Sequence, residues 1–318
     1  MLKPYFRFFL EAFNDLGKWK VHLAFLAWAG ILLYLNFGLD LEKSVFQSIK
    51  TNHYGRWANF SYYFSIQFFP FLLCPGLLYL KNHQKNLGPV LVLAFIGSLV
   101  LAFDRSFILH YSWAREYTYP LSRFLGQCLE ELKSWIIMVL PLGLIWLGMK
   151  SWKKDGFLGV RIKNVNLKLY WILLAGMLPL VFFASFSSGF QSAYPRFNDS
   201  LIQQVSQAYQ INSVWPILTY EILYLADFFT VELFFRGFLI LGISHFIGPQ
   251  VIMPMAASYC ALHFGKPFGE ALSSVFGGYI LGVLAYYTRN IWGGVFIHMG
   301  IAGLMEIFAF FQILIQKD

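Results

Sequence analysis

The chain alternates long apolar runs with short polar connections. An apolar run of about 17 residues or more is long enough for a helix to cross a bilayer. Before residue 191 the runs are 21–37, 60–80, 87–103, a short one at 135–149, and 170–186. After residue 213 they are 214–246, a short one at 251–264, 268–288 and 291–315. This pattern predicts an all-α, polytopic transmembrane helix bundle of eight or nine helices.

A polar segment divides the chain into two apolar halves. Residues 191–213 hold a proline, several glutamines and few apolar runs. We therefore expect N-terminal transmembrane helices over 1–190, a polar extramembrane link over 191–213, and a C-terminal transmembrane bundle over 214–318. Residues 1–20 form an amphipathic stretch of mixed charge rather than a cleavable signal peptide, so the first apolar helix is the expected targeting element.

Composition and charge point to a membrane protein. Hydrophobic residues make up 58% of the 318 and charged residues 13%, about half the charged share of a soluble domain. The net charge of +8 gathers before the first apolar run and in 150–168, which favours a cytoplasmic location for both and does not indicate nucleic-acid binding. We expect an integral protein of a membrane, by default the bacterial inner membrane, whose partners are the lipid bilayer and a membrane protein or peptide.

Four charged side chains interrupt the first apolar run of the C-terminal half. They are Glu221, Asp227, Glu232 and Arg236. Each costs roughly 2.5–3.5 kcal/mol at mid-bilayer, so the cluster is a candidate functional site. Glu232 and Arg236 are one helical turn apart and can pair, which would also make them a purely structural ion pair. Asp227 lies one turn before Val231, about 140° around the helix from Glu232.

Further polar residues follow in the same half. His263 ends a short helix that Gly265 and Pro267 terminate, whereas His298 lies inside the last apolar run with Glu306 about two turns later. A lone intramembrane histidine is most often a hydrogen-bonded packing residue, but two histidines with acidic groups on separate helices can form an acid/base or metal site. Glycines that allow close helix packing flank these positions: Gly278, Gly282, Gly293, Gly294, Gly300 and Gly303.

Cysteine gives no further signal. Cys74, Cys128 and Cys260 are far apart and show no paired spacing, so the sequence predicts neither a disulfide framework nor a thiolate metal site. We expect no cofactor and no metal.

The order of these motifs resembles the CPBP (Abi, CAAX-processing) family of intramembrane endopeptidases. The resemblance rests on Glu-Leu-Phe-Phe-Arg-Gly at 232–237, the Tyr259 to His263 segment, the glycine-containing run from Gly278, and Ile-Trp-Gly-Gly-Val-Phe-Ile-His at 291–298. It spans about residues 215–310. The family motifs are Glu-Glu-x-x-x-Arg, Phe-x-x-x-His, and His-x-x-x-Asn or Asp.

The resemblance implies a glutamate-dependent peptidase in which the first Glu activates water and two histidines assist. This chain departs from that set, because Val231 stands at the first Glu position and Ala302 at the Asn position. Glu232, His263 and His298 match the remaining positions, and Tyr259 stands where the family has Phe. We expect Arg236, Tyr259 and Glu306 to give structural support. Valine cannot accept a proton, so the family mechanism cannot run unchanged.

Three functions are open at this point. The favoured one is a degenerate family member that binds a membrane protein or peptide without cutting it, as an accessory subunit. The alternative is an active variant peptidase whose base is Asp227, Glu232 or Glu306, working with the two histidines. A proton-coupled transporter ranks last, because the uneven helix set shows no internal repeat.

Overall fold

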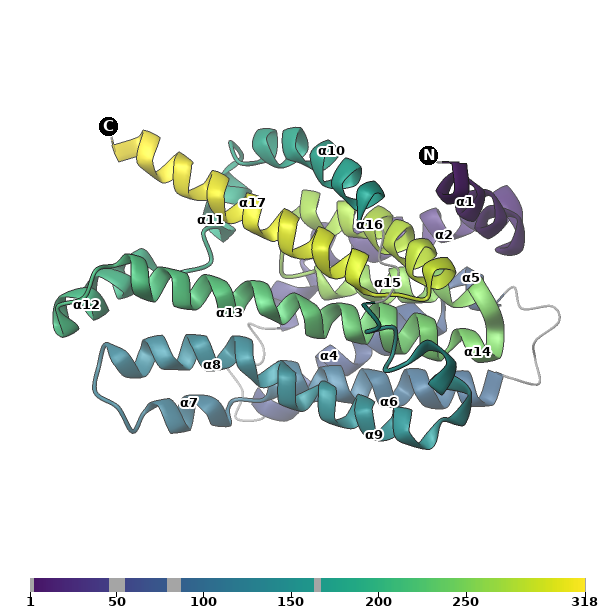
Figure 1. The fold of residues 1–318 in the computed structure, drawn as a ribbon, viewed down its shortest axis with the longest axis horizontal. Helices are drawn as coiled ribbons and strands as arrows, with labels where there is room; N and C mark the ends of the chain where they lie inside the picture. The colour runs from purple at the N-terminus through teal and green to yellow at the C-terminus, as the bar shows by residue number, and fades with distance from the viewer. Residues whose placement is uncertain (1–2, 46–54, 79–86, 163–166, 318) are drawn as a thin grey trace. The chain divides into compact units, whose positions relative to one another are not determined.

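The structure is a computed structural model that describes residues 3–45, 55–78, 87–162 and 167–317. Over these ranges the regular structure is helical and contains no strand, which confirms the predicted all-α bundle (Figure 1). The last two residues of the run 60–80, and Lys163 of the basic stretch 150–168, lie outside the described residues.

The helices follow the apolar runs closely. The first half of the chain contains α1 (Lys3–Asp15), α2 (Lys18–Leu33), η1 (Tyr34–Gly38), α4 (Gly55–Leu72), α5 (Pro75–Leu78), α6 (Leu87–Ser106), α7 (Leu109–Ala114), α8 (Leu121–Ile137), α9 (Val139–Gly148) and η3 (Lys150–Asp155). The second half contains α10 (Lys168–Ala184), α11 (Ser188–Ala193), α12 (Asp199–Tyr209), α13 (Val214–Glu232), η4 (Leu233–Gly242), α14 (Ser244–Ile247), η5 (Gly248–Val251), α15 (Ile252–Leu262), α16 (Phe268–Thr288) and α17 (Trp292–Lys317).

Five stretches of the described residues are long and apolar enough to cross a membrane. They are Lys18–Gly38, Leu87–Ala114, Val214–Leu262, Phe268–Thr288 and Trp292–Ile315. Lys168–Ala184 is a shorter apolar helix. The chain is therefore an integral membrane protein.

Two of the expected runs are interrupted, and proline accounts for one interruption. The run 60–80 breaks after α4, which contains Pro70, and α5 starts at Pro75. Because proline lacks an N–H, it cannot donate to the preceding turn and ends or kinks a helix there. The run 135–149 breaks at Met138, between α8 and α9.

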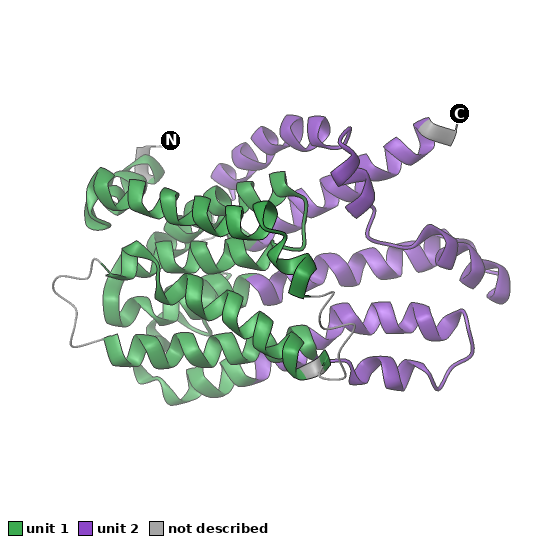
Figure 2. Cartoon of the chain, turned by 180° about the vertical axis from the view of Figure 1, so that it is seen from behind, with its two compact units in different colours: residues 1–106, 141–165, 232–294 green, residues 107–140, 166–231, 295–318 purple. Residues whose placement is uncertain are grey.

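The described chain divides into two compact units (Figure 2). Unit 1 comprises residues 1–106, 141–165 and 232–294, and unit 2 comprises 107–140, 166–231 and 295–318. The boundaries of the two units do not coincide with those of the three segments 1–190, 191–213 and 214–318. The division of the chain into these three domains stays a prediction. Within 191–213, the polar stretch 199–209 is the helix α12.

The centre of unit 1 is formed by α15 and η4. In unit 1, α15 packs against α4 and α16, and η4 packs against α6 and α16. Gly278 and Gly282 of α16 face α15: a Cβ at Gly278 would lie 3.3 Å from the backbone of Ala256, and one at Gly282 would lie 2.9 Å from Met255. The small-residue spacing seen in the sequence thus brings two helix backbones together.

The segment η4 continues α13 without a break but is π-helical. Its backbone N–H groups bond to carbonyls five residues earlier, a geometry that is rare and often marks functional sites. All of Leu233–Gly242 is buried, including Arg236. The π-helical turn therefore begins directly after Glu232 and carries the charged partner of that residue.

Unit 2 has its own apolar clusters. One joins α8, α12, α13 and α17 around these buried residues: Phe124, Cys128, Phe197, Leu201, Ile202, Val205, Tyr220, Tyr224 and Ala302. A second cluster lies farther along α17, where Ala309 packs against Val181, Phe190 and Tyr194.

Candidate functional site

Glu232 and Arg236 form a fully buried ion pair in unit 1. The Arg236 Nη1 donates to Glu232 Oε1 over 2.7 Å, and both side chains are 0% exposed. The pairing expected from their spacing along the helix is therefore present. Because both charges are removed from water, each depends on the other for electrostatic compensation.

The other side of the Glu232 carboxylate lies against the first turn of α17. A Cβ placed on Gly294 would be 1.9 Å from Glu232 Oε2 and 2.7 Å from its Cδ. Only glycine permits this approach. The N-terminal turn of a helix carries partial positive charge, so the contact is electrostatically favourable for a carboxylate.

A row of aromatic and basic groups extends the pair within unit 1. The Arg236 guanidinium carbon lies 4.5 Å from the ring centroid of the buried Tyr259. The Tyr259 ring meets the His263 ring edge-on at 4.6 Å between centroids. Arg236, Tyr259 and His263 thus form one contiguous arrangement.

The tautomer of a neutral His263 follows from its backbone contact. His263 Nδ1 lies 2.8 Å from the carbonyl oxygen of Tyr259. A carbonyl oxygen only accepts, so Nδ1 donates the hydrogen. When the ring is neutral, Nε2 is then the nitrogen that carries the lone pair.

The remaining predicted site residues lie in unit 2. The His298 ring lies 5.2 Å from the Phe228 ring, centroid to centroid. The Thr230 hydroxyl lies 2.8 Å from both the carbonyl oxygen and Oδ1 of Asp227. Both carboxylate oxygens of Glu306 accept from the backbone N–H of Arg196, at 3.1 and 3.0 Å.

The two positions that depart from the family motifs are both buried. Val231 is 9% exposed, and Ala302 is 4% exposed. Ala302 belongs to the apolar cluster of unit 2 that includes Tyr220 and Tyr224. The predicted site residues are therefore divided between the units, and their catalytic roles stay predictions. In the described part of the chain, no three His, Cys, Asp or Glu side chains are placed to hold a metal ion.

The C-terminal region carries a recognisable family pattern. The family model for the Type II CAAX prenyl endopeptidase Rce1-like proteins matches residues 213–304. The chain is similar to this family over these residues. The match confirms the resemblance to CAAX-processing intramembrane endopeptidases that the motifs indicated over about the same residues. No curated protein and no solved structure matched the chain.

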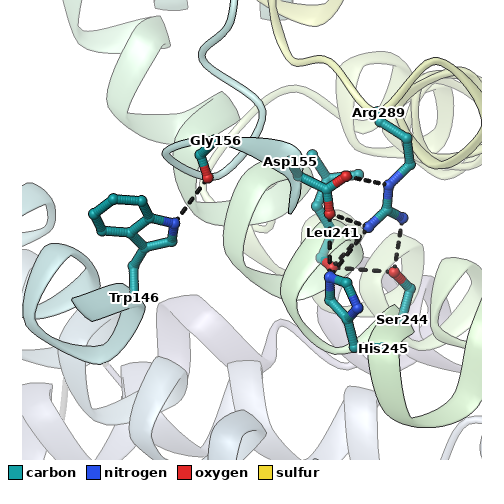
Figure 3. A network of polar contacts seen from close by, with 7 residues as sticks. All are labelled: Trp146, Asp155, Gly156, Leu241, Ser244, His245 and Arg289. Atoms are coloured by element: carbon teal, nitrogen blue, oxygen red, sulfur yellow. Dashed lines mark hydrogen bonds and ion pairs between the residues drawn. The ribbon is translucent and has the colours of Figure 1, made fainter. Parts of the chain in front are cut away.

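A polar network connects the matched region 213–304 to the basic stretch that follows α9 (Figure 3). Asp155 Oδ1 accepts from Arg289 Nε over 2.9 Å, and Asp155 Oδ2 pairs with Arg289 Nη2. His245 Nε2 lies 3.1 Å from Asp155 Oδ2. Arg289 also donates to the Ser244 hydroxyl over 3.0 Å and to the carbonyl oxygen of Leu241 over 3.4 Å. All of these residues belong to unit 1.

The pKa of Asp155 reflects this network. Burial raises the pKa of the carboxyl, but the hydrogen bonds from His245 and Arg289 and their charges lower it more, to about 2. Asp155 is thus ionised across the physiological range. The sequence reasoning missed this network; the one available signal was a lone acid among the lysines of 150–168.

Proposed function

We propose that this protein is a membrane-embedded, peptidase-like subunit that binds a membrane protein or peptide without cutting it. The observation that carries the proposal is the state of Glu232, the carboxylate that remains in the first motif. Arg236 pairs with it at 2.7 Å, and the neighbouring motif position is Val231. A carboxylate held in a buried ion pair is a poor general base, because accepting a proton would leave the arginine charge uncompensated.

The other acidic candidates support the same conclusion. Asp227 is engaged by the Thr230 hydroxyl of its own helix, and Glu306 is engaged by the backbone N–H of Arg196. Both contacts lie within unit 2, and each accounts for the presence of its carboxylate without a catalytic role. The burial of Ala302 among apolar and aromatic side chains further supports a packing role where the family motif has a polar residue.

The family match supports one ligand class as the first to test. The matching family is described as a CAAX prenyl endopeptidase, so a lipid-modified C-terminal peptide is the first ligand to test. We propose the bacterial inner membrane as its location, the default expected for a sequence with no obvious organelle signal.

An active variant peptidase is the second candidate. It is favoured by His263, whose Nδ1 contact with Tyr259 leaves Nε2 as the proton-accepting nitrogen of the neutral ring. A histidine held in one tautomer is what a hydrolytic site requires. For cleavage, a carboxylate or a second histidine must contact the same attacking water molecule as His263.

The test combines a binding assay and a cleavage assay on one preparation. Wild-type protein in lipid nanodiscs is incubated with a fluorescent farnesylated CAAX peptide, and both anisotropy and product release are measured. We expect saturable binding and no product. His298→Ala should leave binding within about twofold, since no reaction is lost.

A gain-of-function variant sharpens this test. Val231→Glu restores the carboxylate of the first motif, with Val231→Gln as the matched control of similar size and no proton-accepting group. We expect product only with Val231→Glu, alone or combined with Ala302→Asn. Cleavage by the wild type that disappears in His298→Ala would refute the proposal in favour of the variant peptidase. Absence of any peptide binding would refute the ligand class.

A further inference from the structure

One end of unit 1 carries a basic stretch held against the turn between α16 and α17. The backbone N–H of Ile291 donates to the carbonyl oxygen of Gly159 over 3.2 Å, and Trp292 Nε1 donates to the carbonyl oxygen of Val160 over 2.8 Å. The ion pair of Asp155 with Arg289 adds a third connection. The stretch 150–161 is therefore fixed to this turn rather than loosely attached.

The turn lies at a membrane surface. It joins the two apolar spans Phe268–Thr288 and Trp292–Ile315. Because a chain leaves the hydrocarbon core between consecutive spans, residues 289–291 lie at the boundary with water. The basic stretch bound to them lies at the same boundary. Its exposed cations are Lys150, Lys153, Lys154 and Arg161.

The helix α1 lies at the same end of unit 1. The Phe8 ring stacks on the Tyr287 ring at 5.0 Å between centroids, and Tyr287 is the residue before the last one of α16. The side chain of Gln250 donates to the carbonyl oxygen of Asp15 over 3.3 Å. Gly17, at φ 97°, then redirects the chain into the span Lys18–Gly38. Chain connectivity and packing thus both place α1 at the surface end of a membrane span.

α1 presents a second apolar face that unit 1 does not cover. Phe6, Leu10 and Phe13 are 66%, 48% and 38% exposed and recur at the spacing of one helix face. A strongly amphipathic helix with exposed aromatic residues is typical of a segment that lies in the interface plane of a bilayer. Trp19, 58% exposed, follows directly, and the Lys20 ammonium lies 5.7 Å from its ring centroid.

We propose that this surface binds anionic phospholipid headgroups. It consists of α1, the start of α2 and the stretch 150–161, and its exposed cations are Arg7, Lys18, Lys20, Lys150, Lys153, Lys154 and Arg161. The partner is a leaflet of phosphatidylglycerol or a similarly charged lipid. Each cation near such a leaflet adds electrostatic attraction, and the apolar face of α1 adds burial in the headgroup region.

The mixture of charge and apolar surface favours lipid over an acidic peptide or nucleic acid. Both of those partners would leave Phe6, Leu10 and Trp19 exposed to water, whereas a bilayer covers them. Two of the acids near the cations are engaged in ion pairs: Glu11 pairs with Arg7 at 2.6 Å and Asp155 pairs with Arg289. The side chains of Lys18, Lys20, Lys150, Lys153 and Lys154 are exposed, and the Lys153 ammonium lies 3.5 Å from the centroid of the Trp146 ring.

The experiment measures lipid preference on the full-length protein. Delipidated protein in a neutral detergent is titrated with phosphatidylglycerol or phosphatidylcholine, and bound lipid is counted by native mass spectrometry. The test variant replaces Lys150, Lys153 and Lys154 with Gln. Its matched control replaces three exposed cations elsewhere, Lys43, Arg115 and Arg123, with Gln.

We expect the wild type and the control variant to bind phosphatidylglycerol at least about tenfold more tightly than phosphatidylcholine, and the test variant to lose most of this preference. Half-molar salt should weaken the wild-type preference without any mutation, so the inference stays testable if the triple variant fails to fold. Competition by inorganic phosphate at millimolar concentration would indicate a soluble phosphate site instead. A preference that survives both salt and the test variant, or that the control variant loses equally, would overturn the proposal.

Discussion

Replacing Gly294 with alanine is the most direct test of the buried ion pair. The new Cβ would lie 1.9 Å from Glu232 Oε2 and 2.7 Å from Glu232 Cδ. These separations are far below contact distance, so the carboxylate or the first turn of α17 has to move. The carboxylate cannot turn into water, because both Glu232 and Arg236 are 0% exposed.

The expected loss of stability follows from two contributions. An extra methyl group in a packed interior costs about 1–3 kcal/mol. Complete loss of a buried ion pair through removal of one partner costs about 3–5 kcal/mol, and a partial displacement costs less. We therefore expect Gly294→Ala to lower the free energy of unfolding by about 2–5 kcal/mol.

The assay is thermal and SDS-induced unfolding of the detergent-solubilised protein, followed by tryptophan fluorescence. Gly303→Ala is the matched control, because it lies in the same helix and a Cβ there meets nothing within 4 Å. Alanine is a better helix former than glycine by about 1 kcal/mol, so the control should be neutral or slightly stabilising. Equal melting temperatures for the two variants would refute the reasoning.

A double variant without the ion pair identifies the cause of the expected loss of stability. Glu232→Ala with Arg236→Leu removes both charges, and replacing a buried pair with apolar groups is often neutral. In this background the added methyl group at Gly294 no longer meets a carboxylate. The cost of Gly294→Ala should then fall to about 1 kcal/mol or less. An unchanged cost would mean that the clash lies elsewhere in unit 1.

Three further outcomes are expected. Arg236→Ala alone should destabilise by about 3–5 kcal/mol, measured by SDS unfolding, because it leaves the Glu232 charge buried; a loss below 1 kcal/mol would contradict this. The pKa of Asp155 is lowered to about 2, so the stabilisation by its ionised carboxylate is complete above the unfolded value near 3.9 and is lost as the pH falls toward 2. The melting temperature of Asp155→Asn should therefore fall less over this pH range than that of the wild type. Gly159 has φ +80°, and a Cβ there would lie 2.4 Å from a leucine methyl, so Gly159→Ala should lower stability by about 1–3 kcal/mol. Gly148→Ala is the control and should not, because a Cβ there meets nothing within 4 Å. Melting curves and limited proteolysis around residue 159 check both variants.

The sequence alone determined the class and the approximate position of the helices. Apolar runs of membrane-spanning length have one stable solution in lipid, because every backbone polar group must bond within its own segment. The run predicted at 268–288 is α16, and that predicted at 291–315 is α17 with small differences at its ends. The spacing of Glu232 and Arg236 also predicted their pairing, since residues four apart share a helix face.

Only the tertiary structure decided what the charged groups contact. The contact of Glu232 with Gly294 joins residues distant in the chain, and no local pattern reports how closely two helices approach. The same is true of Asp155 and Arg289, whose pairing depends on how a basic stretch packs against a turn far along the chain. Local periodicity is fixed by backbone geometry, whereas these contacts depend on side-chain packing between separate helices.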